Sequence, residues 1–319
     1  MSFKDSKVAI IGAGNVGATT AYSIINQGLC EEVVLIDVNK DKAYAEALDM
    51  AHSVYFMNRN IKIYAGEYKD CSDADVVIIT ASAPMPKDSH SRLEMLAPSM
   101  NIMKSIVTSV MDSGFDGIIL VISNPVDIMT YYAWKISGLP YRQVIGSGTN
   151  LDSARLCCEL AKLYDLDAKS VSAFVCGEHG DSEIAAWSSA NISGIPLDNF
   201  CEMRGHYNHM EATERIAAEV KQSAYEIISK KGATYYGIAM SVKRICEAII
   251  RDEKSILPIS TMLHGEYGIS DVVLSLPCIV GRDGYETKVP IDLDQEEVSK
   301  LHESANTLKE VLSEFFAEN

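Results

Sequence analysis

The sequence has no run of about 20 apolar residues, the length that a helix needs to cross a bilayer. The apolar run near its start is too short for the core of a secretion signal, so we expect a cytoplasmic protein that does not enter a membrane. Blocks of like charge and Pro- or Ser-rich linkers are also missing. We therefore expect neither a charged tail nor loosely tethered domains.

The cysteines form no C-x-x-C pair and show no zinc-like spacing with histidine. Neither a disulfide framework nor a bound metal is expected, and the thiols should be reduced and mostly in the core. The eight cysteines are Cys30, Cys71, Cys157, Cys158, Cys176, Cys201, Cys246 and Cys278.

Basic residues are scarce relative to acidic ones: 28 Lys and Arg against 44 Asp and Glu give a formal net charge of −16. Such a field repels nucleic acid and acidic lipid surfaces, so neither is an expected partner. A small anionic ligand would need a local cationic clamp. The 319 residues are 47% apolar, which is enough to bury a large core.

Short β-branched runs alternate with amphipathic stretches in the first half of the chain. Apolar runs of this length predict parallel strands buried on both faces, with helices between them. The expected fold is α/β, a doubly wound parallel sheet of the Rossmann type. The strand-like runs are 8–12, 33–37, 61–66, 76–80, 117–123 and 144–148.

The second half has longer helical periods followed by two strand-like runs, which predicts an α+β substrate domain. We place the boundary near residue 148, giving a nucleotide-binding domain over 1–148 and a substrate domain over 149–319. A last helix should begin after a capping aspartate, either Asp292 or Asp294. The expected helices are 151–164, 210–229 and 234–251, and the expected strands are 255–262 and 270–280.

A glycine motif, GAGNVG, follows the first predicted strand and opens a helix. An aspartate ends the second strand twenty residues beyond the last glycine, which is the context of a dinucleotide site. The carboxylate of Asp37 should accept hydrogen bonds from a ribose diol, and Val38 offers no cation for a 2′-phosphate. This favours NAD over NADP. The candidate cofactor-binding residues are Gly12, Gly14, Asn15, Val16, Gly17 and Asp37.

Three further motifs follow in order: VISNPVD at 121–127, LDSAR at 151–155 and GEHGDS at 177–182. With the glycine motif, they make the chain resemble the L-lactate/malate dehydrogenase family, most closely its lactate and 2-hydroxyisocaproate-type members. The resemblance runs from about residue 6 to the C-terminus. It implies an NAD-dependent L-2-hydroxy-acid dehydrogenase that moves a hydride reversibly between NADH and a small 2-keto acid.

The resemblance implies roles for three residues of these motifs. His179 would donate a proton to the substrate carbonyl, a task that suits a group with a pKa near neutrality. Asp152 would fix its tautomer and stabilise the imidazolium. Arg155, three residues later on one helix face, would bind the substrate carboxylate through its planar fork.

Other implied roles fall on loops and element ends. Arg92 would polarise the carbonyl from a loop that closes over the substrate, and Asn124 would contact the substrate oxygen and the nicotinamide. Thr234 would line the pocket at the substrate's methyl end. From the residues alone, Thr234 could equally be a helix-start hydroxyl.

The chain departs from the family at the specificity position, where malate dehydrogenases carry an arginine. This loop is one residue longer and offers Met85 or Pro86, neither of which can pair a second carboxylate. Malate dehydrogenase remains an alternative if Lys87 reaches inward. A flexible methionine there would admit side chains larger than methyl, so pyruvate or a longer aliphatic 2-keto acid is expected.

A second departure concerns regulation. Relatives activated by fructose 1,6-bisphosphate carry an arginine and a histidine where this chain has Cys157 and Ser172, so we expect no such activation. By resemblance, the protein should form a homotetramer or homodimer. Outside the dehydrogenase class, the alternatives are a non-catalytic NAD-binding protein and a dinucleotide-dependent hydrolase, the latter disfavoured by the missing metal ligands.

Overall fold

A computed structural model describes residues 6–83, 92–205 and 209–318 of the protein. The side chains of residues 92–95, 209–211 and 317–318 are not part of this description.

The centre of the molecule is a nine-stranded sheet. Six strands run parallel, in the spatial order β6-β5-β4-β1-β2-β3, and three antiparallel strands from the C-terminal half extend it beyond β6. The parallel strands are β1 (Lys7–Ile11), β2 (Glu32–Ile36), β3 (Lys62–Ala65), β4 (Val76–Ile79), β5 (Ile118–Val121) and β6 (Val144–Gly146). The antiparallel strands are β12 (Ser255–His264), β13 (Ser270–Gly281) and β14 (Gly284–Lys288).

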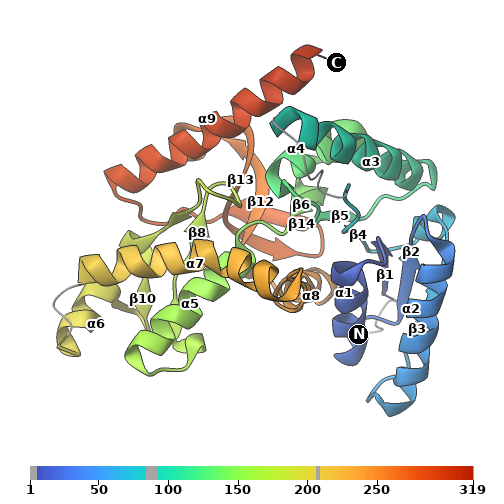
Figure 1. Ribbon diagram of the computed structural model, residues 1–319, viewed down its shortest axis with the longest axis horizontal. Helices are drawn as coiled ribbons and strands as arrows, with labels where there is room; N and C mark the ends of the chain where they lie inside the picture. The colour runs from blue at the N-terminus through green and yellow to red at the C-terminus, as the bar shows by residue number, and fades with distance from the viewer. Residues whose placement is uncertain (1–5, 84–91, 206–208, 319) are drawn as a thin grey trace.

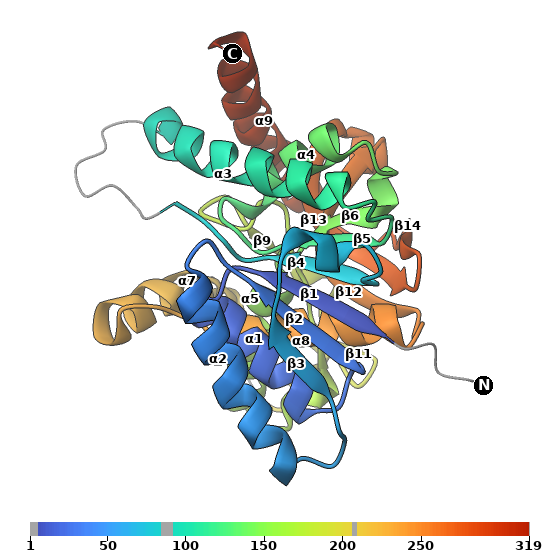
Figure 2. The ribbon, with the colours of Figure 1, turned by 90° about the vertical axis from the view of Figure 1, so that its right-hand side faces the viewer.

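Alternate residues of the central strands supply two hydrophobic cores, one on each face of the sheet. Val8 and Ile10 of β1 pack with one set of helices, whereas Ala9 and Ile11 pack with the other. Figure 2 shows the two helical layers above and below the sheet. The first set comprises α1 (Asn15–Asn26), α2 (Lys40–Ser53) and α8 (Tyr236–Ile250). The second comprises α3 (Arg92–Asp112), α4 (Val126–Ser137) and α9 (Gln295–Glu318).

A third core lies in the C-terminal half, away from the main sheet, where α5 packs against α7 (Figure 1). The helices of this part are α5 (Asn150–Tyr164), α6 (Leu197–Met203) and α7 (His209–Lys231). Its strands are β7 (Val171–Ser172), β8 (Val175–Cys176), β9 (Ile184–Ala185), β10 (Asn191–Ile192) and β11 (Ile195–Pro196). The short 3-10 helices of the chain are 54–56, 68–71, 141–143, 168–170, 187–189 and 266–268.

The predicted doubly wound sheet is confirmed, and so are the long helices and two strands expected after residue 150. The sequence pattern did not reveal β14, nor that β12 to β14 join the parallel sheet rather than form one of their own. Asp294 caps α9: its carboxylate accepts from the N–H of Glu297, whose carboxylate accepts from the N–H of Asp294. In the described residues, no helix is both long and apolar enough to cross a membrane.

Candidate active site

The glycine motif forms a tight turn between β1 and α1. Gly12 has φ of +110°, and a Cβ there would lie 2.6 Å from Thr80 Oγ1. A Cβ on Gly17 would lie 1.8 Å from the carbonyl oxygen of Gly12, so this residue permits close contact of helix and strand. Gly14 is different, because a Cβ there would meet nothing within 4 Å. Space therefore remains beside the backbone at the second glycine, as the approach of a pyrophosphate requires.

The start of α1 suits an anion. Asn15 begins the helix after Gly14, no side chain caps it and its first turn carries no acidic residue. The first N–H groups of a helix have no partner within the helix and carry the positive end of its dipole. The residues present therefore fit the phosphates of a dinucleotide.

Asp37, just after β2, is tied to this turn. Its carboxylate accepts hydrogen bonds from the N–H of Ala13 at 2.6 Å and from the N–H of Asn39 at 2.8 Å. Val38 beside it is 99% exposed and offers no charge to a 2′-phosphate. The position of Asp37 at the carboxyl end of β2, next to the glycine turn, matches that of a ribose-binding acid.

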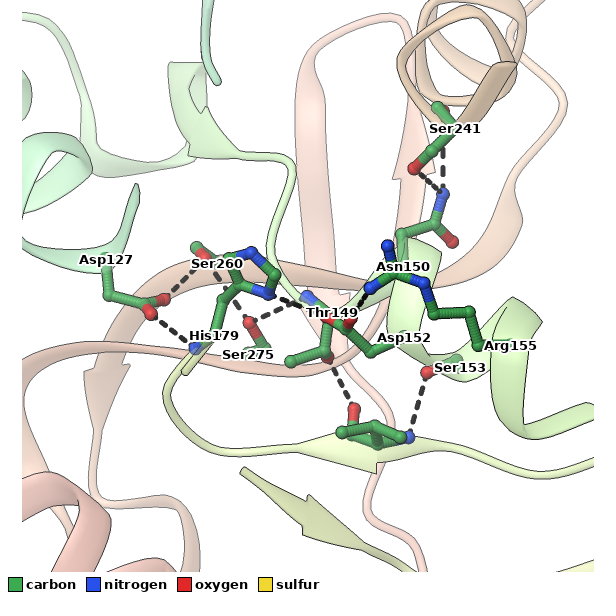
Figure 3. Close-up of polar contacts among 11 residues, drawn as sticks. Asp127, Thr149, Asn150, Asp152, Ser153, Arg155, His179, Ser241, Ser260 and Ser275 are labelled. Atoms are coloured by element: carbon green, nitrogen blue, oxygen red, sulfur yellow. Dashed lines mark hydrogen bonds and ion pairs between the residues drawn. The ribbon is translucent and has the colours of Figure 1, made fainter. Parts of the chain in front are cut away.

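His179 and Asp152 come together from segments 27 residues apart. Nδ1 of His179 lies 2.6 Å from Oδ2 of Asp152, and the aspartate side chain is only 3% exposed (Figure 3). Burial lowers the pKa of His179, but the hydrogen bond and charge of Asp152 outweigh it and raise the pKa to about 9. The imidazole is therefore protonated at neutral pH.

The same carboxylate holds Arg155. Its Nη1 donates to Oδ1 of Asp152 at 2.7 Å, so each carboxylate oxygen has its own partner. Burial raises the pKa of Asp152, yet the bonds and charges of His179 and Arg155 bring it below the usual value. An ionised carboxylate thus sits between two cations.

Backbone contacts of Val175 explain why these residues meet. At the start of α5, Thr149 Oγ1 donates to the carbonyl oxygen of Val175 at 2.5 Å, and Ser153 Oγ accepts from its N–H at 2.8 Å. Both backbone groups of Val175 are therefore bonded at the start of the helix that carries Asp152, one to the N-cap residue Thr149 and one to Ser153. The chain leaving β8 then reaches His179 beside that helix.

Asp127 is a buried acid that the sequence pattern did not single out. It lies in the first turn of α4, is 2% exposed, and accepts bonds from the backbone N–H of His179 at 2.7 Å and from Ser260 Oγ at 2.5 Å. Burial raises its pKa to about 6, although these hydrogen bonds act in the opposite direction. An acid inside the otherwise apolar stretch VDIMTYYAW was the available signal.

Glu183 is a second acid that the sequence did not reveal. It is 8% exposed. Three atoms lie within 4.8 Å of one another: a carboxylate oxygen of Glu183, a carboxylate oxygen of Asp152 and a ring nitrogen of His179. Within the described ranges these three form the one His/Cys/acid group close enough to suggest a metal. Each carboxylate oxygen of Asp152 already accepts a hydrogen bond, one from His179 and one from Arg155. We therefore interpret the three residues as a cluster of charged side chains rather than as metal ligands.

The remaining expected residues are placed only in part. Asn124 is exposed at the end of the segment after β5, where its bond to Pro125 is cis, and Thr234 is half-buried just before α8. Met85 and Pro86 lie outside the described residues. Arg92 begins α3, but its side chain is outside the description.

The described residues supply a proton donor and a guanidinium joined by one buried carboxylate, and a helix terminus suited to phosphates. Such a set can protonate a carbonyl oxygen while holding a carboxylate. A hydride source bound at the glycine turn would complete the reduction of a ketone.

Comparison with known proteins agrees with this geometry. Residues 6–146 match the NAD-binding domain of the lactate/malate dehydrogenase family, and residues 149–319 match the α/β C-terminal domain of the same family. The chain is 47% identical to an L-lactate dehydrogenase of Bacillus velezensis over 318 residues, covering 100% of each chain. It is also 47% identical to an L-lactate dehydrogenase of Acetivibrio thermocellus, covering 96% of each chain.

Solved structures agree as well. The minor L-lactate dehydrogenase of Enterococcus mundtii in its ligand-bound form superposes with a TM-score of 0.94 at 43% identity, over 97% of this chain and 98% of that one. A lactate dehydrogenase from a Medee basin deep-sea metagenome library gives a TM-score of 0.95 at 44% identity, over 98% and 99% of the two chains. These relatives carry the lactate rather than the malate name, in agreement with the expectation from the sequence. The chain belongs to the lactate/malate dehydrogenase family, whose fold, NAD-binding domain and C-terminal domain it carries throughout its length.

Proposed function

We propose that the protein is an NAD-dependent L-2-hydroxy-acid dehydrogenase of the lactate type. It reduces pyruvate, or a longer aliphatic 2-keto acid, to the L-2-hydroxy acid and catalyses the reverse oxidation. The observation that carries the proposal is the single carboxylate of Asp152, which bonds His179 through one oxygen and Arg155 through the other.

Arg155 binds the substrate carboxylate. A guanidinium has five N–H donors, of which one bonds Asp152, so the fork retains donors for a two-point contact. This local cation offsets the acidic field of the whole protein, which otherwise repels an anionic substrate. With its carboxylate fixed, the ketone has a defined position relative to His179.

His179 carries the proton. NADH bound at the glycine turn would supply the hydride for the carbonyl carbon. In reduction, the imidazolium of His179 donates its proton to the carbonyl oxygen, which gives the alcohol and leaves a neutral ring. Asp152 keeps Nδ1 engaged, which leaves Nε2 to face the substrate. In oxidation the neutral ring takes the hydroxyl proton, and Asp152 stabilises the resulting charge.

Three further residues complete the site. Arg92 polarises the ketone, Asn124 contacts its oxygen and orders the nicotinamide, and Thr234 lines the pocket at the end that bears the substrate's side chain. The exposed position of Asn124 at the carboxyl edge of the sheet and the half-buried position of Thr234 before α8 support these roles.

The apolar specificity position, Met85 or Pro86, supports 2-keto acids without a second carboxylate. We expect higher kcat/KM for pyruvate and 2-ketoisocaproate than for oxaloacetate, measured by the loss of NADH absorbance. The His179→Asn variant is expected to lose at least a hundredfold in kcat with all three acids. A clear preference for oxaloacetate would contradict the substrate assignment, and full activity of the variant would contradict the role of His179.

Fructose 1,6-bisphosphate is not expected to activate the protein. Cys157 donates from its thiol to the carbonyl oxygen of Ala173 at 3.6 Å, next to Ser172, so the two substituted positions are neighbours and neither supplies a cation. A marked fall in KM on adding the sugar bisphosphate would contradict this expectation.

The organisation of the protein is also proposed. Residues 1–148 form the NAD-binding domain and residues 149–319 the substrate domain, and the chain assembles as a homotetramer or homodimer in the cytoplasm. The positions of the two family matches support the division, and the family resemblance supports the assembly. Light scattering of the purified protein would measure its oligomeric state directly.

A further inference from the structure

Glu183 lies beside the His179–Asp152 pair without bonding to either residue. A carboxylate oxygen of Glu183 is within 4.8 Å of both a carboxylate oxygen of Asp152 and a ring nitrogen of His179. In the part of the chain that the structure describes, its carboxylate makes no hydrogen bond or ion pair, although only 8% of the residue is exposed. Its oxygens are not among the buried polar atoms that lack a partner in this described part, so they keep some contact with solvent, while burial of most of the side chain makes the ionised form costly.

A cavity opens on Glu183. Its volume is about 270 Å³, and it is lined by residues of α5, β8, β9, α7 and the start of α9. Leu156 and Trp187 contribute apolar walls, whereas Lys221 and Lys300 bring cations to it. A cavity of this size admits several water molecules. Water can therefore reach Glu183, which lets its carboxyl group exchange a proton with solvent.

The charged groups around Glu183 come from its own segment and from three helices. They are His179, Glu178 and Asp181 near it in sequence, Asp152 and Arg155 on α5, Lys221 on α7, and Asp294, Glu296, Glu297 and Lys300 at the start of α9. Asp127 on α4 also faces His179, because its carboxylate accepts a hydrogen bond from the backbone N–H of His179.

The two lysines of the cavity have other partners. Lys221 donates to the backbone carbonyl of Asp181 at 3.0 Å and keeps its positive charge, whereas Lys300 forms an ion pair with Glu296 at 2.6 Å. Burial, and then the charge of Asp152, raise the pKa of Glu183 to about 7, while the charge of His179 acts in the opposite direction. Glu183 therefore gains its negative charge near neutral pH, at a position where the charge of His179 acts on it more strongly than that of Lys221 or Arg155, and where a ring nitrogen of His179 lies within 4.8 Å.

We propose that Glu183 is an electrostatic positioning residue for the proton on His179. When it is ionised, its negative charge adds to that of Asp152 in stabilising the imidazolium, so that the protein reduces its substrate up to a higher pH. The kinetic part of this inference rests on the proposed function. Glu183 touches neither substrate nor cofactor in this scheme and acts only through the charge it places beside the imidazole.

The test is the Glu183→Gln variant, which keeps the shape of the side chain and removes its charge. For a unit charge about 5 Å away, we expect the alkaline fall in kcat/KM for pyruvate reduction to move to lower pH by roughly half a unit to one unit. At pH 6 the kcat/KM of the variant should stay within about twofold of the wild-type value. The pKa of Glu183 is raised to about 7, so its carboxyl group is mostly protonated at pH 6 and carries no charge for the substitution to remove.

Glu296→Gln is the matched control. It removes the same charge from the same cavity, but its side chain is 76% exposed and paired with Lys300, so solvent screens it. We expect its alkaline limb to coincide with that of the wild type. Equal shifts in both variants would show a general charge effect and overturn the specific role of Glu183.

A second readout does not depend on catalysis. Diethyl pyrocarbonate acylates neutral imidazole, so the rate of modification of His179, obtained by subtracting the rate of a His179→Asn sample, reports its protonation against pH. The same shift is expected in Glu183→Gln, and its absence would overturn the inference even if the protein reduced no 2-keto acid. Conversely, an acylation shift without turnover would refute the proposed function alone.

If Glu183→Gln does not fold, Glu183→Asp should shift the acylation curve in the same direction by less, and no shift would again overturn the inference.

Discussion

The backbone N–H of His179 donates a hydrogen bond of 2.7 Å to the carboxylate of Asp127, which lies 52 residues earlier in the chain. The second oxygen of this buried carboxylate accepts from Ser260. One side chain thus joins α4, the loop after β8 and the strand β12. His179 is held twice, by its backbone through Asp127 and by its ring through Asp152 (Figure 3).

Replacing Asp127 by alanine should destabilise the fold and reduce turnover. The variant leaves the N–H of His179 and the hydroxyl of Ser260 without their buried acceptor, which should lower the free energy of unfolding by about 2–4 kcal/mol. Urea unfolding followed by circular dichroism measures this loss. Asp127→Asn keeps an acceptor oxygen and should lose less. An alanine variant as stable as the wild type would show that the contact contributes nothing to the fold.

Alanine at the second and third glycines of the motif should separate cofactor binding from folding. A Cβ on Gly14 meets no protein atom within 4 Å but fills space beside the backbone, so Gly14→Ala should keep the wild-type Tm and bind NADH more weakly. A Cβ on Gly17 would overlap the carbonyl oxygen of Gly12, so Gly17→Ala should lower the Tm as well.

Thermal unfolding without cofactor and titration of NADH fluorescence provide the two measurements. If Gly14→Ala bound NADH with unchanged affinity, the added methyl group would not be in contact with the dinucleotide. The dinucleotide would then have to bind elsewhere.

Replacing Arg155 by lysine should act mainly on KM. Lysine keeps the positive charge but not the planar fork, so the two-point contact with the substrate carboxylate is lost. We expect KM for pyruvate to rise roughly ten- to a hundredfold with a smaller change in kcat. Arg251→Lys, at an arginine on the surface that pairs with Glu247, is the control and should leave both constants unchanged. A fall in kcat at constant KM would instead assign Arg155 to the chemical step.

Much of this arrangement follows from local patterns. The glycine turn and the buried strands depend on neighbours in sequence, and His179, Asp152 and Arg155 were identifiable from motifs that the family shares. The structure brings these three side chains together, as the resemblance implied.

Contacts between distant segments were not accessible in this way. Asp127 bonds a residue 52 positions away and Ser260 lies 133 positions from it, and no local period links them. The same is true of β12 to β14: the sequence predicted two strands here but not β14, and the docking of β12 against β6 depends on tertiary packing. Glu183 follows a recognisable motif directly, yet its burial becomes apparent only when α5, α7 and α9 enclose it.

His179, held by Asp152, carries the proton in this mechanism. The measurement that tests this role most directly is the pH dependence of kcat/KM for pyruvate reduction, compared between the wild type and Asp152→Asn. Reduction needs the imidazolium, and a pKa raised to about 9 keeps it protonated below that pH, so wild-type activity should fall as the pH rises through about 9. Without the carboxylate, the fall should begin at least one unit lower, nearer the ordinary histidine pKa of about 6.5, and the plateau should be at least tenfold lower. The same midpoint in both proteins would contradict the account.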